Sequence, residues 1–191
     1  MAAIYSAYAI YAECTGDDLG TEEMKVGMPN RIFNKVEAHS GNAIDIPEAS
    51  KGERIRLQRG IYRVNGMSFL TMLSAGVPPV PPVPVKYLTD VYPGYCILYD
   101  ANNPPKGLDD MKGVFCVGSM GTAYDGTPSI FECVIEVKDQ PLEISLGHQC
   151  SYPDYASDPD YDPETANPKA YLRIGGSDYH VCARIAIFKI A

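Results

Sequence analysis

Apolar and polar residues alternate in short runs along this chain, most cleanly over residues 130–138. One face of this run is apolar and the other is charged: Phe131, Cys133, Ile135 and Val137 against Glu132, Glu136 and Lys138. A period of two predicts a strand, and a single apolar face is typical of an antiparallel sheet with one side toward water. We therefore expect a half-buried strand here.

The carboxyl-terminal run, residues 180–190, is apolar on both faces. One face holds Val181, Ala183, Ile185 and Ile187, and the other holds Cys182, Ala186, Phe188 and Ile190. Such a strand belongs in the middle of a packed all-β structure, because both of its faces need cover. We expect it to be hydrogen-bonded along both edges within two stacked layers.

The rest of the chain also predicts strands. The 17 glycines and 16 prolines interrupt it too often for long helices. Alternation at residues 4–11, and further runs at 31–36, 54–57, 60–73, 95–100, 114–118, 142–146 and 170–174, bring the total to about ten strands. So many short strands predict an all-β sandwich or closed barrel, and 191 residues suit a single domain, 1–191.

Two segments break the alternation. Residues 77–85 are rich in proline and predict polyproline II, either a stiff connector over one end of the sandwich or a ligand for an SH3-like groove. Residues 151–168 combine acidic residues with prolines and tyrosines, and predict a long acidic surface loop.

The charge and hydropathy of the sequence limit the kinds of binding partner and the cellular locations to be expected. A net charge of −8 without clustered Lys or Arg disfavours nucleic acid and anionic membranes. The sequence contains no run of 18 apolar residues, so it predicts no membrane-spanning helix. The amino terminus lacks the basic residues with which a signal peptide begins. From these features we expect a cytoplasmic or virion-associated protein, or one exported by a non-classical route.

The six cysteines include no CxxC pair, and four of them lie inside apolar runs: Cys96, Cys116, Cys133 and Cys182. A reduced thiol in such a run behaves as a small hydrophobe. Reduced, buried thiols are the favoured interpretation, and one or more disulfides are the alternative.

Residues 34–45 and 52–68 resemble the globular-head domain of the first complement component, q subcomponent, a relative of tumour necrosis factor. Residues 142–146 and 172–187 look like the last three strands of that family. The resemblance implies a two-sheet antiparallel jelly-roll sandwich of about ten strands that assembles as a homotrimer. The Pro-rich and acidic segments exceed the family's usual connections, and the family's tryptophan is missing.

Within the matched region, Gly60 allows a sharp turn into a strand on which Tyr62, Val64 and Gly66 share one face. Tyr62 is expected in the core with a hydrogen-bond partner for its hydroxyl, and a ligand contact is the alternative.

Two metal sites are candidates. His148 and Cys150, and likewise His180 and Cys182, are two residues apart and share a strand face, so that together they offer a Cys₂His₂ zinc set. Hard oxygen ligands for calcium alternate in the acidic loop: Asp158, Asp160, Asp162 and Glu164. Buried thiols with hydrogen-bonded histidines, and a solvated loop, are the plainer interpretations, and no cofactor is otherwise expected.

Catalytic signatures are missing from the sequence: no Gly-x-Ser-x-Gly, no phosphate-binding loop and no oriented nucleophile–base pair. Aromatic residues in the acidic loop, Tyr152, Tyr155 and Tyr161, are typical of contacts with glycans or proteins. We expect a non-catalytic, trimeric recognition module that binds a protein or glycan through its end loops. The alternative is a structural protein of a virion surface or fibre tip.

Overall fold

The computed structural model describes residues 5–14, 30–69, 93–105, 111–122, 127–150 and 181–191. The described chain forms strands almost throughout: β1 (Ala7–Cys14), β2 (Lys35–Ser40), β3 (Ile44–Asp45), β4 (Ile55–Leu57), β5 (Gly60–Ser68), β6 (Pro93–Asp100), β7 (Val114–Val117), β8 (Gly121–Thr122), β9 (Ser129–Val137), β10 (Leu142–Cys150) and β11 (Val181–Lys189), with one 3₁₀ turn at Glu48–Ser50.

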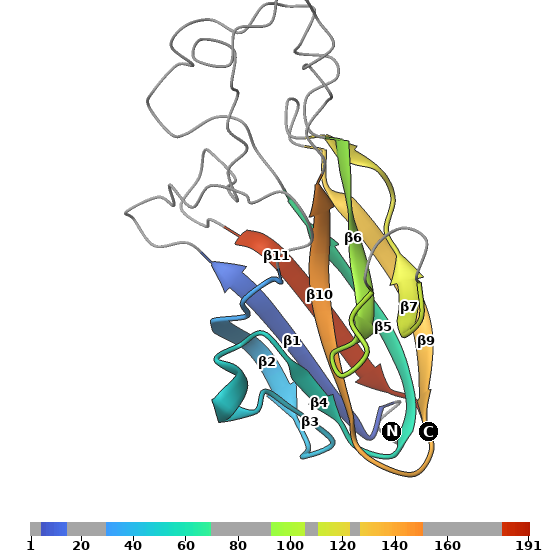
Figure 1. Ribbon diagram of the computed structural model, residues 1–191. Coiled ribbons are helices and arrows are strands. Elements are labelled where there is room, and N and C mark those ends of the chain that lie inside the picture. The colour runs from blue at the N-terminus through green and yellow to red at the C-terminus, as the bar shows by residue number, and fades with distance from the viewer. Residues whose placement is uncertain (1–4, 15–29, 70–92, 106–110, 123–126, 151–180) are drawn as a thin grey trace, which may run out of the picture.

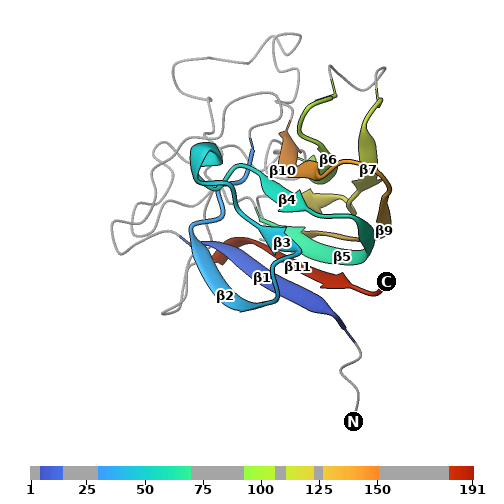
Figure 2. The same ribbon diagram turned by 90° about the horizontal axis from the view of Figure 1, so that it is seen from below.

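All strand pairs are antiparallel, and they make two sheets that face each other (Figure 1; Figure 2). One sheet has the order β2-β1-β11-β5-β9 and the other β3-β4-β10-β6-β7, with β8 beside β6. The pairs are nested, because β1 pairs with β11, β4 with β10, β5 with β9 and β6 with β7. A chain folded back on itself and rolled into two layers is a jelly roll, so the predicted fold class is confirmed.

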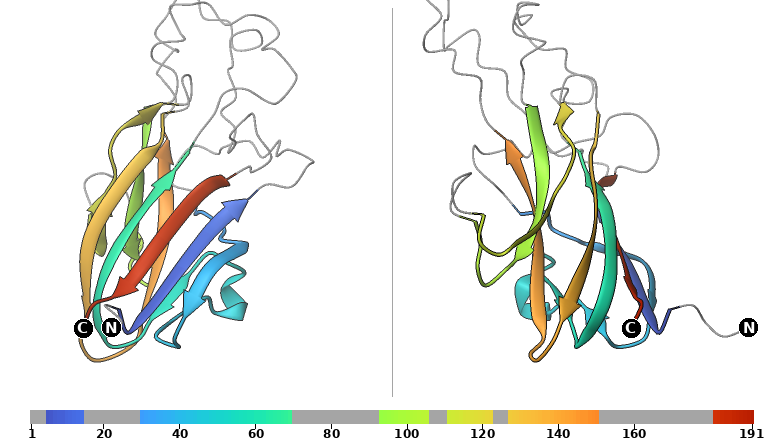
Figure 3. Two further views of the ribbon diagram at one scale, coloured as in Figure 1. Left: turned by 180° about the vertical axis from the view of Figure 1, so that it is seen from behind. Right: turned by 90° about the vertical axis from the view of Figure 1, so that its right-hand side faces the viewer.

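The core fills the space between the two layers, which Figure 3 shows edge-on in its right-hand view. Its side chains come from the inward-facing positions of both sheets and include Ala9, Tyr11, Ile55, Leu57, Tyr62, Val64, Leu98, Ile135, Ile144, Leu146, Ile185 and Ile187. Tyr62 is fully buried, and its hydroxyl donates to Gln58 O at 2.7 Å and approaches Ala43 O at 3.3 Å. Its predicted place in the core is confirmed, and so is the expected partner for its hydroxyl.

Strand β11 lies between β1 and β5 and is hydrogen-bonded along both edges, as its pattern predicted. Its inner face is buried, but on its outer face Arg184 is exposed and Ala186 and Phe188 are half-exposed. Cys182, at the start of the strand on the same outer face, is buried. The prediction of cover on both faces is therefore confirmed there and is wrong for the outer face from Arg184 onward.

Other predicted boundaries shift for local reasons. Residues 31–34 keep an alternating burial pattern but form no ladder, because Arg31 N donates to Leu146 O while Phe33 N donates to Gly52 O. The strand begins instead at Lys35. Strand β5 ends at Ser68, and residues 70–73 of the run predicted there lie outside the described residues. The short strands β3 and β8 were not predicted. The runs predicted at 77–85, 151–168 and 170–174 lie outside the described residues.

Candidate interaction surface

The outer face of the five-stranded sheet carries apolar side chains that face away from the core. The register aligns these apolar side chains with four polar ones in rows across the strands: Tyr8, Phe188, Arg63 and Val134 in one row, Ile10, Ala186, Asn65 and Glu132 in the next, and Arg184, Met67 and Ile130 in the third. Val134 is 64% exposed and Ile130 is 58% exposed, which is high for large aliphatic side chains. The three rows together form what we name the outer apolar face.

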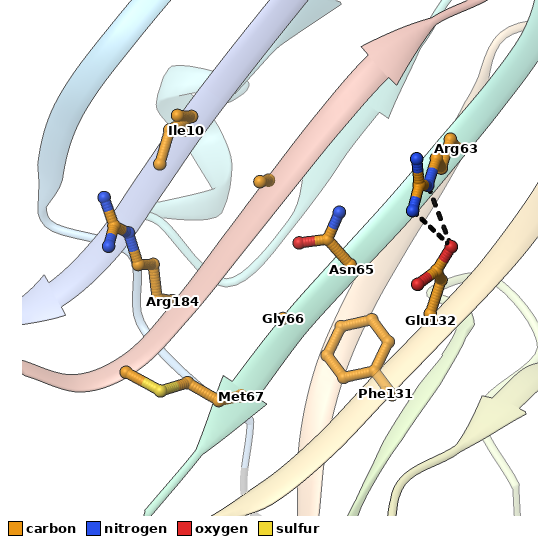
Figure 4. Close-up of a pocket in the computed structure, with 9 residues that line it drawn as sticks. Ile10, Arg63, Asn65, Gly66, Met67, Phe131, Glu132 and Arg184 are labelled. Atoms are coloured by element: carbon orange, nitrogen blue, oxygen red, sulfur yellow. Dashed lines mark hydrogen bonds and ion pairs between the residues drawn. The ribbon is translucent and has the colours of Figure 1, made fainter.

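A shallow pocket of about 530 Å³ lies on this face, where small side chains leave room (Figure 4). Ala186 and Gly66 are among the residues that line it, and Figure 4 shows the ring of Phe131 beside Gly66. A side chain at Gly66 would collide with that ring and with the carbonyl of Arg184, so a glycine is needed for these strands to pack. The pocket is lined by both apolar and polar residues.

Charged groups around the pocket are paired within the chain. Nε and a terminal nitrogen of Arg63 both lie 2.8 Å from Oε1 of Glu132 on the neighbouring strand. The guanidinium of Arg184 lies 2.6 Å from Glu37 of β2. Because these charges are already neutralised, the face offers apolar contact area rather than an unbalanced charge.

A second cluster, the buried polar network, joins the two sheets from inside. The backbone N–H of Arg31 donates to Leu146 O of β10 at 2.8 Å, while its fully buried guanidinium reaches across to the other sheet. There Nε donates to Ser68 Oγ at 2.7 Å, one terminal nitrogen lies 3.4 Å from Glu13, and the other donates to the carbonyl of Phe69. A buried guanidinium held by several acceptors cross-links the layers at this end of the sandwich.

His148 of β10 completes the network. Its Nδ1 lies 2.7 Å from Ser68 Oγ, which also accepts a hydrogen bond from Nε of Arg31. The other ring nitrogen, Nε2, has no hydrogen-bond partner among the described residues and packs against Gly94. Burial, reinforced by the nearby Arg31 cation, lowers the pKa of His148 to about 3. The imidazole is therefore neutral at physiological pH.

Most sequence-predicted site residues lie outside the described part of the chain. This holds for Tyr152, Tyr155 and Tyr161, for the calcium candidates Asp158, Asp160, Asp162 and Glu164, and for His180. Cys150 ends β10, and only its backbone is described. These sites remain predictions.

Two members of the zinc set are described. His148 lies on β10 and Cys182 on β11, in opposite sheets, and both are buried. Because Nδ1 of His148 already pairs with Ser68, only Nε2 is left to meet a metal ion. No three His, Cys, Asp or Glu side chains gather as a metal site within the described ranges, and the full zinc set stays a prediction.

Sequence reasoning missed Glu13, Arg31 and Ser68. A signal was available for two of them: Glu13 ends an apolar run, and Arg31 occupies the same face as Phe33 in an alternating run. A charge at an inward position marks a residue that must find a buried partner. Nothing in the sequence, however, pairs these particular residues across the fold.

No protein-family model and no curated protein matches this chain. Among solved structures it is similar to murine APRIL, with a TM-score of 0.46 at 8% identity over 96% of this chain and 98% of that one. It is also similar to the vertex protein P5 of PRD1, with a TM-score of 0.48 at 11% identity over the whole of both chains. At these identities the likeness concerns the fold alone, and the jelly-roll architecture itself follows from the strand order above.

Among the elements described, no helix has the length and hydropathy needed to cross a membrane.

Proposed function

We propose that this protein is a non-catalytic recognition module that works as a homotrimer. The observation that carries the proposal is the outer apolar face, an uncovered sheet surface on strands whose other face is fully packed. Exposed apolar area of this kind marks a protein interface. The arginines on this face are already paired with glutamates of the same chain, so a partner would meet it mainly through apolar contacts. A second copy of the chain can supply such an apolar surface.

A second apolar patch lies at the side of the sandwich and is the surface that meets the outer apolar face of a neighbour. Phe115 and Val117 of β7 point outward, and Met120, which follows the strand, is also exposed. Contact between two different patches is heterologous, so that each copy uses both surfaces and the assembly closes into a ring. The resemblance to the tumour necrosis factor group gives three as the number of copies.

Catalysis is not supported by the contacts inside the sandwich. Ser68 and His148 do place a hydroxyl against an imidazole, but both side chains are buried and Ser68 also holds Arg31. A nucleophile needs access to substrate and a base that takes up its proton. His148 is poorly suited to that task, because its pKa is lowered to about 3.

Recognition is assigned to the end of the sandwich where β10 stops and β11 starts, since residues 151–180 connect these strands. Tyr152, Tyr155 and Tyr161 would contact a protein or glycan, and calcium held by Asp158, Asp160, Asp162 and Glu164 would order the connection.

Light scattering of the purified chain tests the trimer. We expect a mass three times that of one chain, and a shift to monomer for Ile130→Glu on the outer apolar face. Ile32→Glu is the matched control, because Ile32 is also exposed but lies outside the five-stranded sheet. A monomeric wild-type chain at micromolar concentration would overturn the proposal.

A glycan array and direct binding to candidate cell-surface proteins test recognition. We expect binding that the triple substitution Tyr152→Ala, Tyr155→Ala and Tyr161→Ala abolishes while the trimer persists. A stable trimer without any binding supports the alternative, a structural role at a virion surface or fibre tip.

A further inference from the structure

Two cysteines face each other across the open side of the sandwich. Strand β7 is the edge of one sheet and β9 is the edge of the other, and the two strands are in contact (Figure 1). Cys116 of β7 and Cys133 of β9 both point inward and pack against the core cluster. No hydrogen-bonded ladder joins β7 to β9, so their side chains make the connection between the sheet edges.

The Cys116 thiol lies next to the backbone that leads into Cys133. Sγ of Cys116 is 3.5 Å from the carbonyl oxygen of Glu132, the residue that precedes Cys133. Both are free cysteines of intermediate exposure, so that a small reagent can reach the pair.

We propose that Cys116 and Cys133 form a redox pair that low-molecular-weight disulfides convert into an intramolecular disulfide between the sheets. In the first step the Cys116 thiolate attacks the reagent, forming a mixed disulfide and releasing one small thiol. In the second step Cys133 loses its proton to solvent and attacks Sγ of Cys116, releasing the second small thiol. Two protein thiols are oxidised and one reagent disulfide is reduced to two thiols.

The order of attack follows from the surroundings of Cys133. Burial, together with the neighbouring Cys116, raises the pKa of Cys133 to about 12, so that this thiol is protonated at neutral pH. The thiolate is the attacking species, and Cys133 therefore serves as the resolving partner. We expect slow closure of the disulfide near neutral pH and faster closure as the pH rises.

Closure links residues 17 apart and ties the free edges of the two sheets, which restricts the unfolded chain. For a chain of this size we expect the melting temperature to rise by about 5–10 °C on oxidation. The effect should vanish on reduction with dithiothreitol.

The test uses the full chain incubated with glutathione disulfide, alkylated and mapped by mass spectrometry. Trypsin leaves both cysteines in one peptide, residues 113–138, which should lose about 2 Da on oxidation. Cleavage after Glu132 separates the cysteines, so the two fragments should stay joined until a reductant is added. This mapping needs no substitution and is unaffected by whether a variant folds.

Variants then assign the effect. Cys116→Ser and Cys133→Ser should each abolish the stabilisation by oxidation, whereas Cys14→Ser, at a half-exposed cysteine of β1, should keep it. The proposal is overturned if Cys116 and Cys133 are both alkylated after oxidation, or if the joined fragments contain any other cysteine.

Discussion

The two faces of the five-stranded sheet differ although the same strands build them. On the inner face Val64 and Ile185 are fully buried against the opposing sheet. On the outer face Ile130 and Val134 are as apolar as their inner counterparts, yet more than half of each side chain is exposed. The same kind of side chain therefore meets the chain's own core on one side and open surface on the other.

This difference shows what can and cannot be inferred from a strand with apolar residues on both faces. Alternation tells which residues share a face, and apolar residues on both faces place β11 in the middle of its sheet. It does not tell whether the second face is covered by the same chain or by another molecule. At the outer apolar face the described layers of the chain end, which makes this face the surface on which the proposed partner copy would pack.

Matched arginines test the comparison most strongly. Arg31→Ala removes the buried guanidinium that Ser68, Glu13 and the Phe69 carbonyl share, and we expect the free energy of unfolding to fall by about 3–5 kcal/mol. Arg184→Ala on the outer face breaks an exposed pair with Glu37 and should change it by less than about 1 kcal/mol. Urea unfolding followed by circular dichroism measures both. Equal losses would erase the distinction between the faces.

Matched valines come next. Val64→Ala opens a cavity between the sheets and should lower the free energy of unfolding by about 2 kcal/mol. Val134→Ala should leave it within about 0.5 kcal/mol in the monomer but weaken self-association, because its side chain lies on the outer apolar face. Unfolding at low concentration and light scattering separate the two effects. A destabilised monomer with unchanged self-association for Val134→Ala would contradict the proposed interface.

Much of the fold follows from local patterning. Side-chain alternation predicted the strands that form β9 and β11. The buried position of Tyr62 was predicted because a buried hydroxyl needs a hydrogen-bond partner, which Gln58 O supplies. Strands β3 and β8 were beyond prediction, because two residues are too few to show a period.

The candidate sites were less predictable, for a physical reason. The buried polar network joins residues as far apart as Arg31 and His148 through Ser68, and single-strand patterns carry no information on such contacts. The outer apolar face is likewise a product of register, since Met67 opposes Ile130 only when β5 and β9 pair. The tyrosine and calcium predictions at residues 151–168 remain untested.

Matched histidines sharpen the comparison through pH. The pKa of His148 is about 3 in the folded protein and near 6.5 when exposed, so the unfolded chain binds the extra proton between these values. The contribution of His148 to stability is therefore constant above pH 6.5 and falls, by up to about 1.4 kcal/mol per pH unit, as the pH drops from 6.5 toward 3. His148→Gln should flatten this slope between pH 6.5 and 5, while His39→Gln, at an exposed position of β2, should retain it. Identical slopes in wild type and His148→Gln would rule out the buried neutral imidazole.

Matched tyrosines provide the smallest and most local test. Tyr62→Phe keeps the buried ring but removes the hydroxyl that donates to Gln58 O, so we expect a loss of about 1 kcal/mol. Tyr8→Phe, on the outer apolar face, should change the free energy of unfolding by less than about 0.5 kcal/mol, because solvent reaches this ring. Thermal unfolding of both variants resolves the difference. If Tyr8→Phe proves the more destabilising variant, the outer face of β1 is packed within the chain and is not free for a partner.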